Sequence, residues 1–213
     1  MLSQYTPHPV NSMVWKCLLI IYNKNVKLNP QAIINSLDYR AKKSLLKKQL
    51  IDVKLMPSFF KNSAFCSLNI DEEMAHILIS DSSLLNLLES IPFLWLEVNE
   101  RAIRKQPRQG FAIQKLSEVC RLMMDDFGTG NTSYSALRSD IFSTVKIDKK
   151  LLWNNTTDKN DLLCIVTQLR MLCPIVIAEG VETPNYKKEA IRAGAYGLQG
   201  WLFPGCYFDN LDV

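Results

Sequence analysis

Two adjacent aspartates, Asp125 and Asp126, give the clearest sign of chemistry in this chain of 213 residues. They follow an apolar run and stand just before Gly128 and Gly130, which allow the backbone to turn sharply. Two neighbouring carboxylates repel each other unless a cation lies between them, and hard divalent metals take oxygen ligands of this kind. Taken by itself, the pair would favour a polar strand end that enters a turn, and it is the neighbouring motifs that change this interpretation.

Four other apolar runs also end at a polar residue. In chain order the five end residues are Asn69, Glu97, Asp125, Lys146 and Glu179, and they are separated by 28, 28, 21 and 33 residues. A strand, a helix and two loops occupy about 30 residues, so this spacing predicts repeated βα units with a parallel sheet. Parallel strands buried on both faces read as continuous apolar runs, as these do. In barrels of this class the active site lies where strands end, so the five side chains are expected to converge.

The motifs around these residues resemble those of the EAL domain, the cyclic-di-GMP phosphodiesterase module of bacteria. In chain order they are Ser67-Leu-Asn-Ile70, Leu96-Glu-Val-Asn-Glu100, Asp125-Asp-Phe-Gly-Thr-Gly130, Lys146-Ile-Asp148, Ala178-Glu-Gly-Val-Glu-Thr183 and Gln199-Gly200. The match is strongest over residues 64–204. The resemblance implies a single EAL-like domain over residues 1–213 with an α/β fold, a modified TIM-like (β/α)8 barrel that this short chain would slightly truncate.

The resemblance also implies hydrolysis of cyclic-di-GMP to the linear dinucleotide pGpG with two Mg²⁺ or Mn²⁺ ions. Matched position by position, the metal ligands would be Asn69, Glu97, Asp125 and Asp126. The catalytic residues would be Lys146 beside the attacking water, Glu179 and Glu182 around the metal and water shell, and Glu100, which would hold the loop after Asp126. Gln199 would line the substrate pocket.

The chemistry of phosphodiester hydrolysis agrees with these roles. The reaction needs a water that is nucleophilic near neutral pH and a positive clamp on the phosphate, and two metals about 3.5–4 Å apart supply both. The ammonium of Lys146 is a point charge that can stabilise the attacking hydroxide. The alternative role for Lys146 is an ordinary salt bridge to Asp125 or Glu179.

One part of the family pattern is missing. The family takes its name from a Glu-Ala-Leu string early in the chain, whose glutamate is the first metal ligand, but residues 1–70 contain no glutamate. The best placement of the string is Cys17-Leu-Leu19, which puts Cys17 or Lys16 in the carboxylate's position, and the phosphate-binding arginine that should follow is also absent. Mg²⁺ requires hard oxygen ligands, so a thiol is a poor substitute. We therefore expect hydrolysis to be lost or much reduced.

Three helical features are predicted in the first half of the chain. Asn29-Pro30 opens a helix that is expected to run to about Met56, because apolar residues recur there at helical spacing. Asp71-Glu-Glu73 places acids at the start of the next helix, as the helix dipole favours. Ser80-Asp-Ser-Ser83 is expected to interrupt that helix before Leu84.

Charge is unevenly distributed along the chain. Residues 1–70 contain ten lysines and arginines against Asp38 and Asp52, a net charge of +8, whereas the whole chain carries +4. Both acids fall in a helical pattern, so neither is a good substitute for the missing glutamate. Five basic residues cluster on the predicted helix: Arg40, Lys42, Lys43, Lys47 and Lys48. They form either a solvated surface or a docking face for an acidic protein; nucleic acid is less favoured because no recognised nucleic-acid-binding motif accompanies them.

Cysteine usage and hydropathy bear on location. No apolar stretch reaches the roughly 18 residues of a membrane span and the start of the chain lacks a signal-peptide pattern, so no membrane association is expected. Six cysteines are scattered without a paired metal-binding spacing. This pattern favours reduced, buried thiols in the cytoplasm.

Two function classes follow. In the first, which we favour, the chain is a degenerate EAL domain of cyclic-di-GMP signalling and a bacterial regulator that binds a protein partner, as some divergent members do with regulators of motility or adhesion. In the second, it is an active metal-dependent phosphodiesterase in which water or a neighbouring group replaces the missing ligand, as the retention of nearly every other catalytic residue suggests. Binding of cyclic-di-GMP without hydrolysis would suit the first class. By analogy with the family, a homodimer through the segment around Asp126 is expected.

Overall fold

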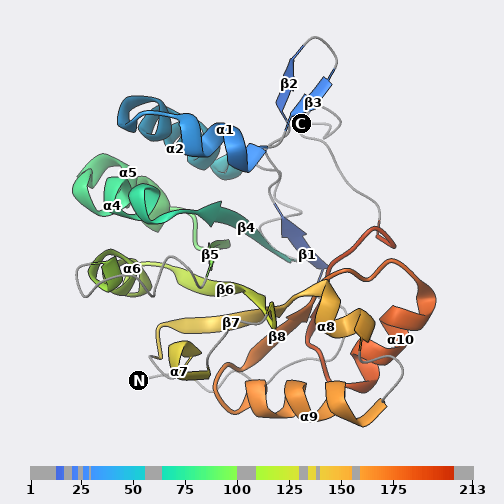
Figure 1. The fold of residues 1–213 in the computed structure, drawn as a ribbon. Coiled ribbons are helices and arrows are strands. Elements are labelled where there is room, and N and C mark those ends of the chain that lie inside the picture. The colour runs from blue at the N-terminus through green and yellow to red at the C-terminus, as the bar shows by residue number, and fades with distance from the viewer. Residues whose placement is uncertain are drawn as a thin grey trace. The chain divides into compact units, whose positions relative to one another are not determined.

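The computed structural model describes residues 13–16, 21–23, 26–28, 30–55, 64–99, 109–129, 134–137, 140–154 and 159–203. From residue 64 onward, strands alternate with one or two helices along these ranges (Figure 1). The strands are β1 (Met13–Lys16), β2 (Ile21–Asn23), β3 (Val26–Leu28), β4 (Ala64–Ile70), β5 (Leu94–Asn99), β6 (Arg121–Phe127), β7 (Phe142–Ile147), β8 (Ile175–Ala178) and β9 (Gly197–Leu198).

The helices vary in length from a single turn to more than four turns. They are α1 (Pro30–Ser36), α2 (Tyr39–Lys54), α4 (Glu72–Ser80), α5 (Ser82–Glu89), α6 (Gln109–Ser117), α7 (Tyr134–Leu137), α8 (Lys149–Asn154), α9 (Lys159–Arg170) and α10 (Pro184–Arg192). None of the helices within the described ranges is long and apolar enough to cross a membrane.

Contacts between residues divide the chain into two compact units. We call the described residues between 15 and 124 the N-terminal unit, and those between 125 and 203, together with Met13 and Val14, the C-terminal unit. Strands β1 and β6 contribute residues to both units.

In the N-terminal unit, β4 and β5 pair in parallel, with Asn69 opposite Glu97. Helix α4 packs against α2, α5 and α6, and α2 also packs against α5. The core is apolar because each element turns one row of side chains inward. Its fully buried members include Leu46, Leu50, Leu68, Met74, Ile77, Leu78, Leu96 and Val98. Strands β2 and β3 form a separate antiparallel pair in which Ile21 lies opposite Leu28.

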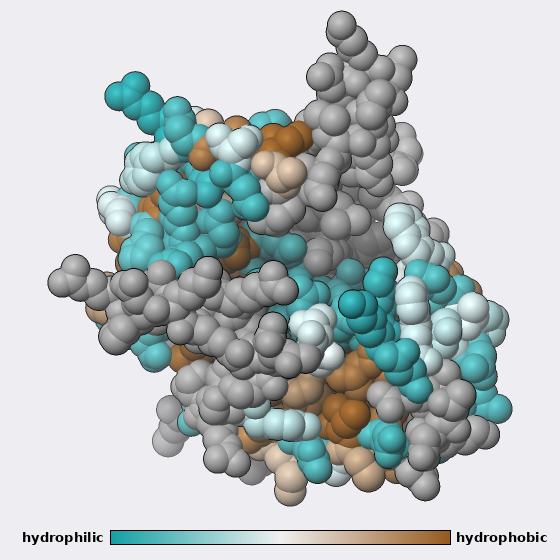
Figure 2. Space-filling model, in the orientation of Figure 1, coloured by the Kyte–Doolittle hydropathy of each residue, from teal (hydrophilic) through white to brown (hydrophobic). Residues whose placement is uncertain are grey.

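In the C-terminal unit, β7 pairs with β8 and β8 with β9, both in parallel. Helix α9 packs on β8, and α10 packs against α8 and α9. The buried residues of β8 form a continuous apolar run, Val176, Ile177 and Ala178, as expected for a parallel strand, whereas in β7 the buried Lys146 lies between Val145 and Ile147. On the face drawn in Figure 2, hydrophilic residues cover much of the described surface, and hydrophobic residues are visible between them. The parallel strand pairs, with helices between the strands in the sequence, confirm the predicted βα organisation within each unit.

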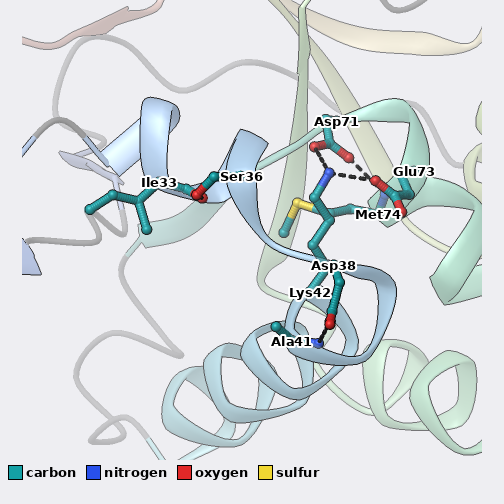
Figure 3. Close-up of polar contacts among 8 residues, drawn as sticks. All are labelled: Ile33, Ser36, Asp38, Ala41, Lys42, Asp71, Glu73 and Met74. Carbon is teal, nitrogen blue, oxygen red and sulfur yellow. Dashed lines mark hydrogen bonds and ion pairs between the residues drawn. The ribbon is translucent and has the colours of Figure 1, made fainter.

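The predicted single helix from Pro30 to about Met56 is wrong, because the segment forms two helices, α1 and α2. Helix α1 ends at Ser36, and Asp38 then begins a second helix by accepting a hydrogen bond from the Ala41 N–H at 2.8 Å (Figure 3). An aspartate at this position satisfies a backbone donor that the new helix would otherwise leave unpaired. Pro30 does open the first helix, as predicted.

The other two helix predictions are confirmed. Asp71 caps α4 by accepting from the Met74 N–H, and Glu72 and Glu73 lie in its first turn. Asp81 ends α4 and caps α5, where its side chain accepts from the backbone of Ser83 and Leu84. The break predicted at Ser80-Asp-Ser-Ser83 is therefore made by a single aspartate.

Candidate functional site

Three carboxylates of the C-terminal unit lie together at the ends of neighbouring elements. Asp125 and Asp126 lie near the end of β6, and Glu179 directly follows β8. One carboxylate oxygen from each lies within 4.8 Å of the other two. Oxygen ligands at this spacing can share one divalent cation.

A fully buried lysine holds two of these carboxylates. The Nζ of Lys146 lies 3.2 Å from Asp125 Oδ1 and also forms an ion pair with Glu179 Oε1. The Lys146 side chain is 0% exposed, and those of Asp125 and Glu179 are 11% and 17% exposed. A charged lysine is tolerated at this depth only when it is paired. Lys146 therefore stabilises the ionised carboxylates of Asp125 and Glu179.

An unusual backbone conformation brings both aspartates to the same place. In a regular strand, successive side chains point to opposite faces of the sheet. Asp126 has φ of 62°, in the left-handed region that residues other than glycine rarely adopt. This departure from strand geometry allows the Asp126 carboxylate to lie near those of Asp125 and Glu179. Such strain is stored where the surrounding structure compensates for it, often at functional sites.

The turn after β6 is fixed by close packing on α8. Gly128 has φ of 103°, and a Cβ atom there would collide with the side chain of Leu151. The Asp148 N–H donates to the Phe127 carbonyl at 2.9 Å. The sequence Asp-Asp-Phe-Gly therefore requires glycine for two reasons, the positive φ and the lack of space.

The loop after β8 is held equally firmly. The Glu179 N–H donates to the Ile147 carbonyl at 3.1 Å, which fixes the backbone of the acid itself. Gly180 has φ of 70°, and its carbonyl accepts a hydrogen bond from Trp153 Nε1 at 2.9 Å. A Cβ atom on Gly180 would collide with Lys149. The Glu179 carboxylate is therefore presented on a backbone with little freedom.

Gln199 lies beside this loop. Its N–H donates to the Ala178 carbonyl at 2.9 Å, and its carbonyl accepts from the Val181 N–H at 3.0 Å. Its side-chain Oε1 is buried and finds no hydrogen-bond partner within the described part of the chain. A buried acceptor without a donor is costly, so this atom is suited to meeting the N–H group of a ligand. Glu182, by contrast, is exposed and lies outside the three-carboxylate cluster.

The N-terminal unit holds two further predicted ligands. Asn69 and Glu97 are opposite each other on β4 and β5, so their side chains share one face of the strand pair. Glu97 is buried and accepts a hydrogen bond from Ser67 Oγ, whereas Asn69 is exposed. Ser67 was not among the predicted site residues, although its position two residues before Asn69 places it on the same face.

Not every predicted site residue is described by the structure. Cys17 follows β1 directly in the sequence, and Glu100 follows β5, and both lie outside the described residues. The C-terminal unit brings Asp125, Asp126 and Glu179 together around Lys146. The roles of all these residues as ligands, catalytic groups or substrate contacts stay predictions.

The basic cluster on α2 is largely neutralised within its own unit. Lys42 is buried, and its Nζ lies 2.9 Å from Asp71 Oδ2 and 2.6 Å from Glu73 Oε2 (Figure 3). Lys43 pairs with Asp81, and Lys48 with Asp52. Burial alone would lower the pKa of Lys42, but the hydrogen bonds to Glu73 and Asp71 outweigh it and raise that pKa above its ordinary value.

A signal for the burial of Lys42 was present in the sequence. Lys42 stands at helical spacing from the three fully buried apolar residues of α2, which are Leu46, Leu50 and Val53. A lysine on the apolar face of a helix is expected to be buried or to extend its charged end to a partner. Because most of the basic cluster on α2 is paired within its own unit, the predicted docking face retains little of its positive charge.

The cysteines of the described residues are free thiols: Cys66, Cys120, Cys164 and Cys173. Burial raises the pKa of Cys120 to about 12 and, together with the nearby charge of Asp140, that of Cys173 to about 12. Thiols that stay protonated are poor nucleophiles and poor metal ligands. None of the four belongs to the carboxylate cluster.

A comparison with protein families identifies the family of this chain. The model of the EAL domain matches residues 25–204, which is most of the chain. The chain belongs to the EAL domain family. The match begins after Cys17-Leu-Leu19, the segment where the family's glutamate was expected.

Its relatives include both enzymes and regulators. The chain is 27% identical over 184 residues to the cyclic di-GMP phosphodiesterase PdeH of Escherichia coli K12. The alignment covers 84% of this chain and 71% of that protein. It is 24% identical over 193 residues to the putative anti-FlhC(2)FlhD(4) factor YdiV of the same organism. That alignment covers 88% of this chain and 81% of YdiV. The likeness to YdiV supports the predicted regulatory role, and the likeness to PdeH keeps the enzymatic alternative open.

Solved structures show the same fold. The chain resembles the crystal structure of the EAL-like domain protein YdiV with a TM-score of 0.77 and 24% identity, over 86% of this chain and 80% of that one. It resembles the PaMucR phosphodiesterase in complex with c-di-GMP with a TM-score of 0.71 and 26% identity, over 88% and 82%. The predicted fold class, an α/β protein of the modified TIM-like type, is confirmed.

Proposed function

We propose that this chain is a regulatory EAL domain of cyclic-di-GMP signalling that acts by binding a protein partner and has lost most or all phosphodiesterase activity. The observation that carries the proposal is the absence of any glutamate from residues 1–70, where the family places its first metal ligand. Loss of one anionic ligand weakens a Mg²⁺ site because this ion depends on a full set of hard oxygens.

The partner is proposed from the regulatory relative. YdiV is named as an anti-FlhC(2)FlhD(4) factor, so a protein assembly of that kind is the first partner to test. Cyclic-di-GMP is proposed as a second ligand that would be bound without being hydrolysed. We also propose a location in the cytoplasm, which the free thiols among the described residues support.

The three carboxylates of the C-terminal unit fit a hard divalent cation. Their oxygens lie within 4.8 Å of one another, a spacing at which three carboxylates can share one hard cation. We propose that Asp125, Asp126 and Glu179 would hold Mg²⁺ or Mn²⁺, and the roles of Asn69 and Glu97 as ligands stay predictions from the sequence. A bound metal supplies an activated water and a positive clamp on the phosphate.

This chain's own residues would then act through binding and positioning. Lys146 holds the carboxylates of Asp125 and Glu179 in place through its two ion pairs. Gln199 would offer its buried, unpartnered Oε1 to an N–H group of the guanine base. Glu182 is exposed, and we propose that it orders water around a bound metal.

A second candidate function, an active phosphodiesterase, is favoured by the retained cluster. Asp125, Asp126 and Glu179 converge although the family's first ligand is missing. Under this alternative, water or a neighbouring group would complete the ligand set.

The deciding experiment measures pGpG formed from cyclic-di-GMP by the purified protein with Mg²⁺ or Mn²⁺, beside the variants Cys17→Glu and Asp125→Ala. We expect the native chain to give no more product than Asp125→Ala. Product from the native chain that disappears in Asp125→Ala would refute the regulatory proposal. Activity gained only by Cys17→Glu would identify the missing carboxylate as the cause.

The partner is tested separately by gel filtration of the chain with purified FlhC(2)FlhD(4). Co-elution supports this partner, and separate elution removes it. That second outcome leaves the hydrolysis result untouched, so the two parts of the proposal are judged independently.

A further inference from the structure

A group of aromatic and lysine side chains lies around the Glu179–Thr183 loop of the C-terminal unit. We call it the aromatic–lysine patch, and its central members are Lys149, Trp153, Tyr186, Lys187, Trp201 and Phe203. They come from α8, α10 and the turn after β9. Over α8 and α10, Figure 2 shows mainly teal and pale residues, as expected where lysines lie beside tryptophan and tyrosine.

Ring contacts join α8 to the start of α10. The rings of Trp153 and Tyr186 stack with their centroids 6.1 Å apart and an interplanar angle of 23°. The Nζ of Lys149 lies 5.1 Å from the centroid of Trp153, a cation–π distance. Trp153 is itself fixed by its hydrogen bond to the Gly180 carbonyl. The aromatic surface therefore rests on a rigid base.

Trp201 stands out because the residue is 82% exposed. The neighbouring Gly200 packs so closely on the backbone of Val181 that a Cβ atom there would collide with it. The Leu202 N–H donates to the Val181 carbonyl at 3.0 Å, and Lys187 lies 5.9 Å from the ring of Phe203. A large aromatic ring presented on a fixed turn is the kind of side chain that anchors protein interfaces.

The charge around the patch is positive. Four lysines are exposed on its segments, namely Lys149, Lys150, Lys187 and Lys188. Over residues 149–154, 181–188 and 199–203, the exposed carboxylate is that of Glu182. None of the four lysines forms an ion pair with another described residue, whereas Lys42, Lys43 and Lys48 of α2 all do. The ammonium groups of the patch are therefore available to an acidic partner.

We propose that the aromatic–lysine patch binds an acidic segment of the protein partner. Carboxylates of that segment would pair with the four lysines, and an apolar side chain would cover Trp201. Nucleic acid suits the patch less well, because four lysines provide little of the phosphate neutralisation on which such binding depends. The inference rests on the proposed regulatory function, for which it names the chemical class of the partner.

The test begins with a phage-displayed library of short random peptides selected on the purified full-length chain. We expect enrichment of peptides that carry several Asp or Glu residues beside an aromatic or aliphatic residue. One enriched peptide is then labelled with fluorescein, and its affinity is measured by fluorescence anisotropy at two salt concentrations.

The variant Trp201→Ala is expected to weaken binding about tenfold, as truncation of a central aromatic anchor does. The variants Lys149→Glu and Lys187→Glu are each expected to weaken it about threefold and to reduce its salt dependence. The matched controls are Met171→Ala, which alters another highly exposed apolar residue, and Lys47→Glu, which alters an exposed lysine on α2. Both controls should bind as the native chain does.

Three results would overturn the inference. In the first, the selection enriches no acidic peptides. In the second, the patch variants bind the peptide as the native chain does. In the third, a labelled DNA duplex binds the chain more tightly than the peptide does, and the same variants abolish that binding. None of them alters the outcome of the hydrolysis assay, so a failure here is distinguishable from a failure of the regulatory proposal.

Discussion

Among the described residues, each of the two units contains a buried lysine held by two carboxylates, and the two arrangements differ in the exposure and in the number of those carboxylates. Lys42 of the N-terminal unit pairs with Asp71 and Glu73, whose side chains are 26% and 47% exposed. Lys146 of the C-terminal unit pairs with Asp125 and Glu179, which are 11% and 17% exposed. Only the second pair has a third carboxylate, Asp126, within 4.8 Å among the described residues.

The difference separates a structural ion pair from a candidate metal site. Lys42 joins α2 to the start of α4, where the positive end of the helix dipole also stabilises the carboxylates of Asp71 and Glu73. Its partners reach solvent, so their charge is partly screened whether or not the lysine is present. The carboxylates of Asp125 and Glu179 are more buried than those of Asp71 and Glu73, so water screens their charge less and the loss of Lys146 should cost more.

The largest expected effect comes from Lys146→Met. This substitution removes the ammonium that pairs with Asp125 and Glu179, and we expect the free energy of unfolding to fall by about 3–5 kcal/mol. Urea denaturation in the presence of a chelator measures the change. Addition of Mn²⁺ should restore part of the loss, because a divalent cation replaces the missing charge.

The double variant Lys146→Met with Asp125→Asn serves as the control. It should be less destabilised than Lys146→Met alone, since one of the repelling charges is removed. Equal stability of Lys146→Met and the native chain would show that the crowding of carboxylates has no energetic consequence, and the contrast with Lys42 would disappear.

A smaller effect is expected for Lys42→Met. Because Asp71 and Glu73 stay accessible to water, we expect a loss of about 1–2 kcal/mol, and Mn²⁺ should not reverse it. The pKa of Lys42 is raised, so its contribution is fully present below its ordinary pKa and is lost as the pH rises through the raised value. The difference between native and variant chains should therefore stay constant from neutral pH up to about pH 10.

Lys47→Met is the matched control for this prediction. Lys47 lies on the same helix and is exposed, so its substitution should change stability by less than about 0.5 kcal/mol. A loss for Lys42→Met as large as that for Lys146→Met would show that burial alone, without the third carboxylate, determines the energy.

The smallest effect concerns the pair of Lys43 and Asp81. The hydrogen bond from Lys43, helped by that from Ser83, lowers the pKa of Asp81 well below its usual range. A depressed folded-state pKa gives stability that is present above the unfolded value and is lost as the pH falls through the folded value. Native stability should therefore decline more steeply between about pH 4 and pH 2 than that of Lys43→Gln, which keeps the Asp81 cap. Parallel declines in the two thermal unfolding series would contradict this.

Local patterns in the sequence predicted much of the architecture. Continuous apolar runs that end in a polar residue placed the strands, because a buried parallel strand needs apolar side chains on both faces. Asp71 and Asp81 marked the helix starts, because a cap depends on residues within one turn. Asp38 is the same kind of cap, and it was missed because the apolar spacing continues across it at nearly helical intervals.

The sequence by itself determined the family, the positions of the strand ends and the absence of the glutamate, since each is a property of residue types in order. Tertiary structure decided which charges are buried and with whom. Lys42 meets Asp71 across 29 positions of the chain, whereas the exposed lysines of α8 and α10 form no ion pair with another described residue. The energy of a charge depends on the water and the opposite charges around it, and these are set by contacts between segments that lie far apart in the sequence.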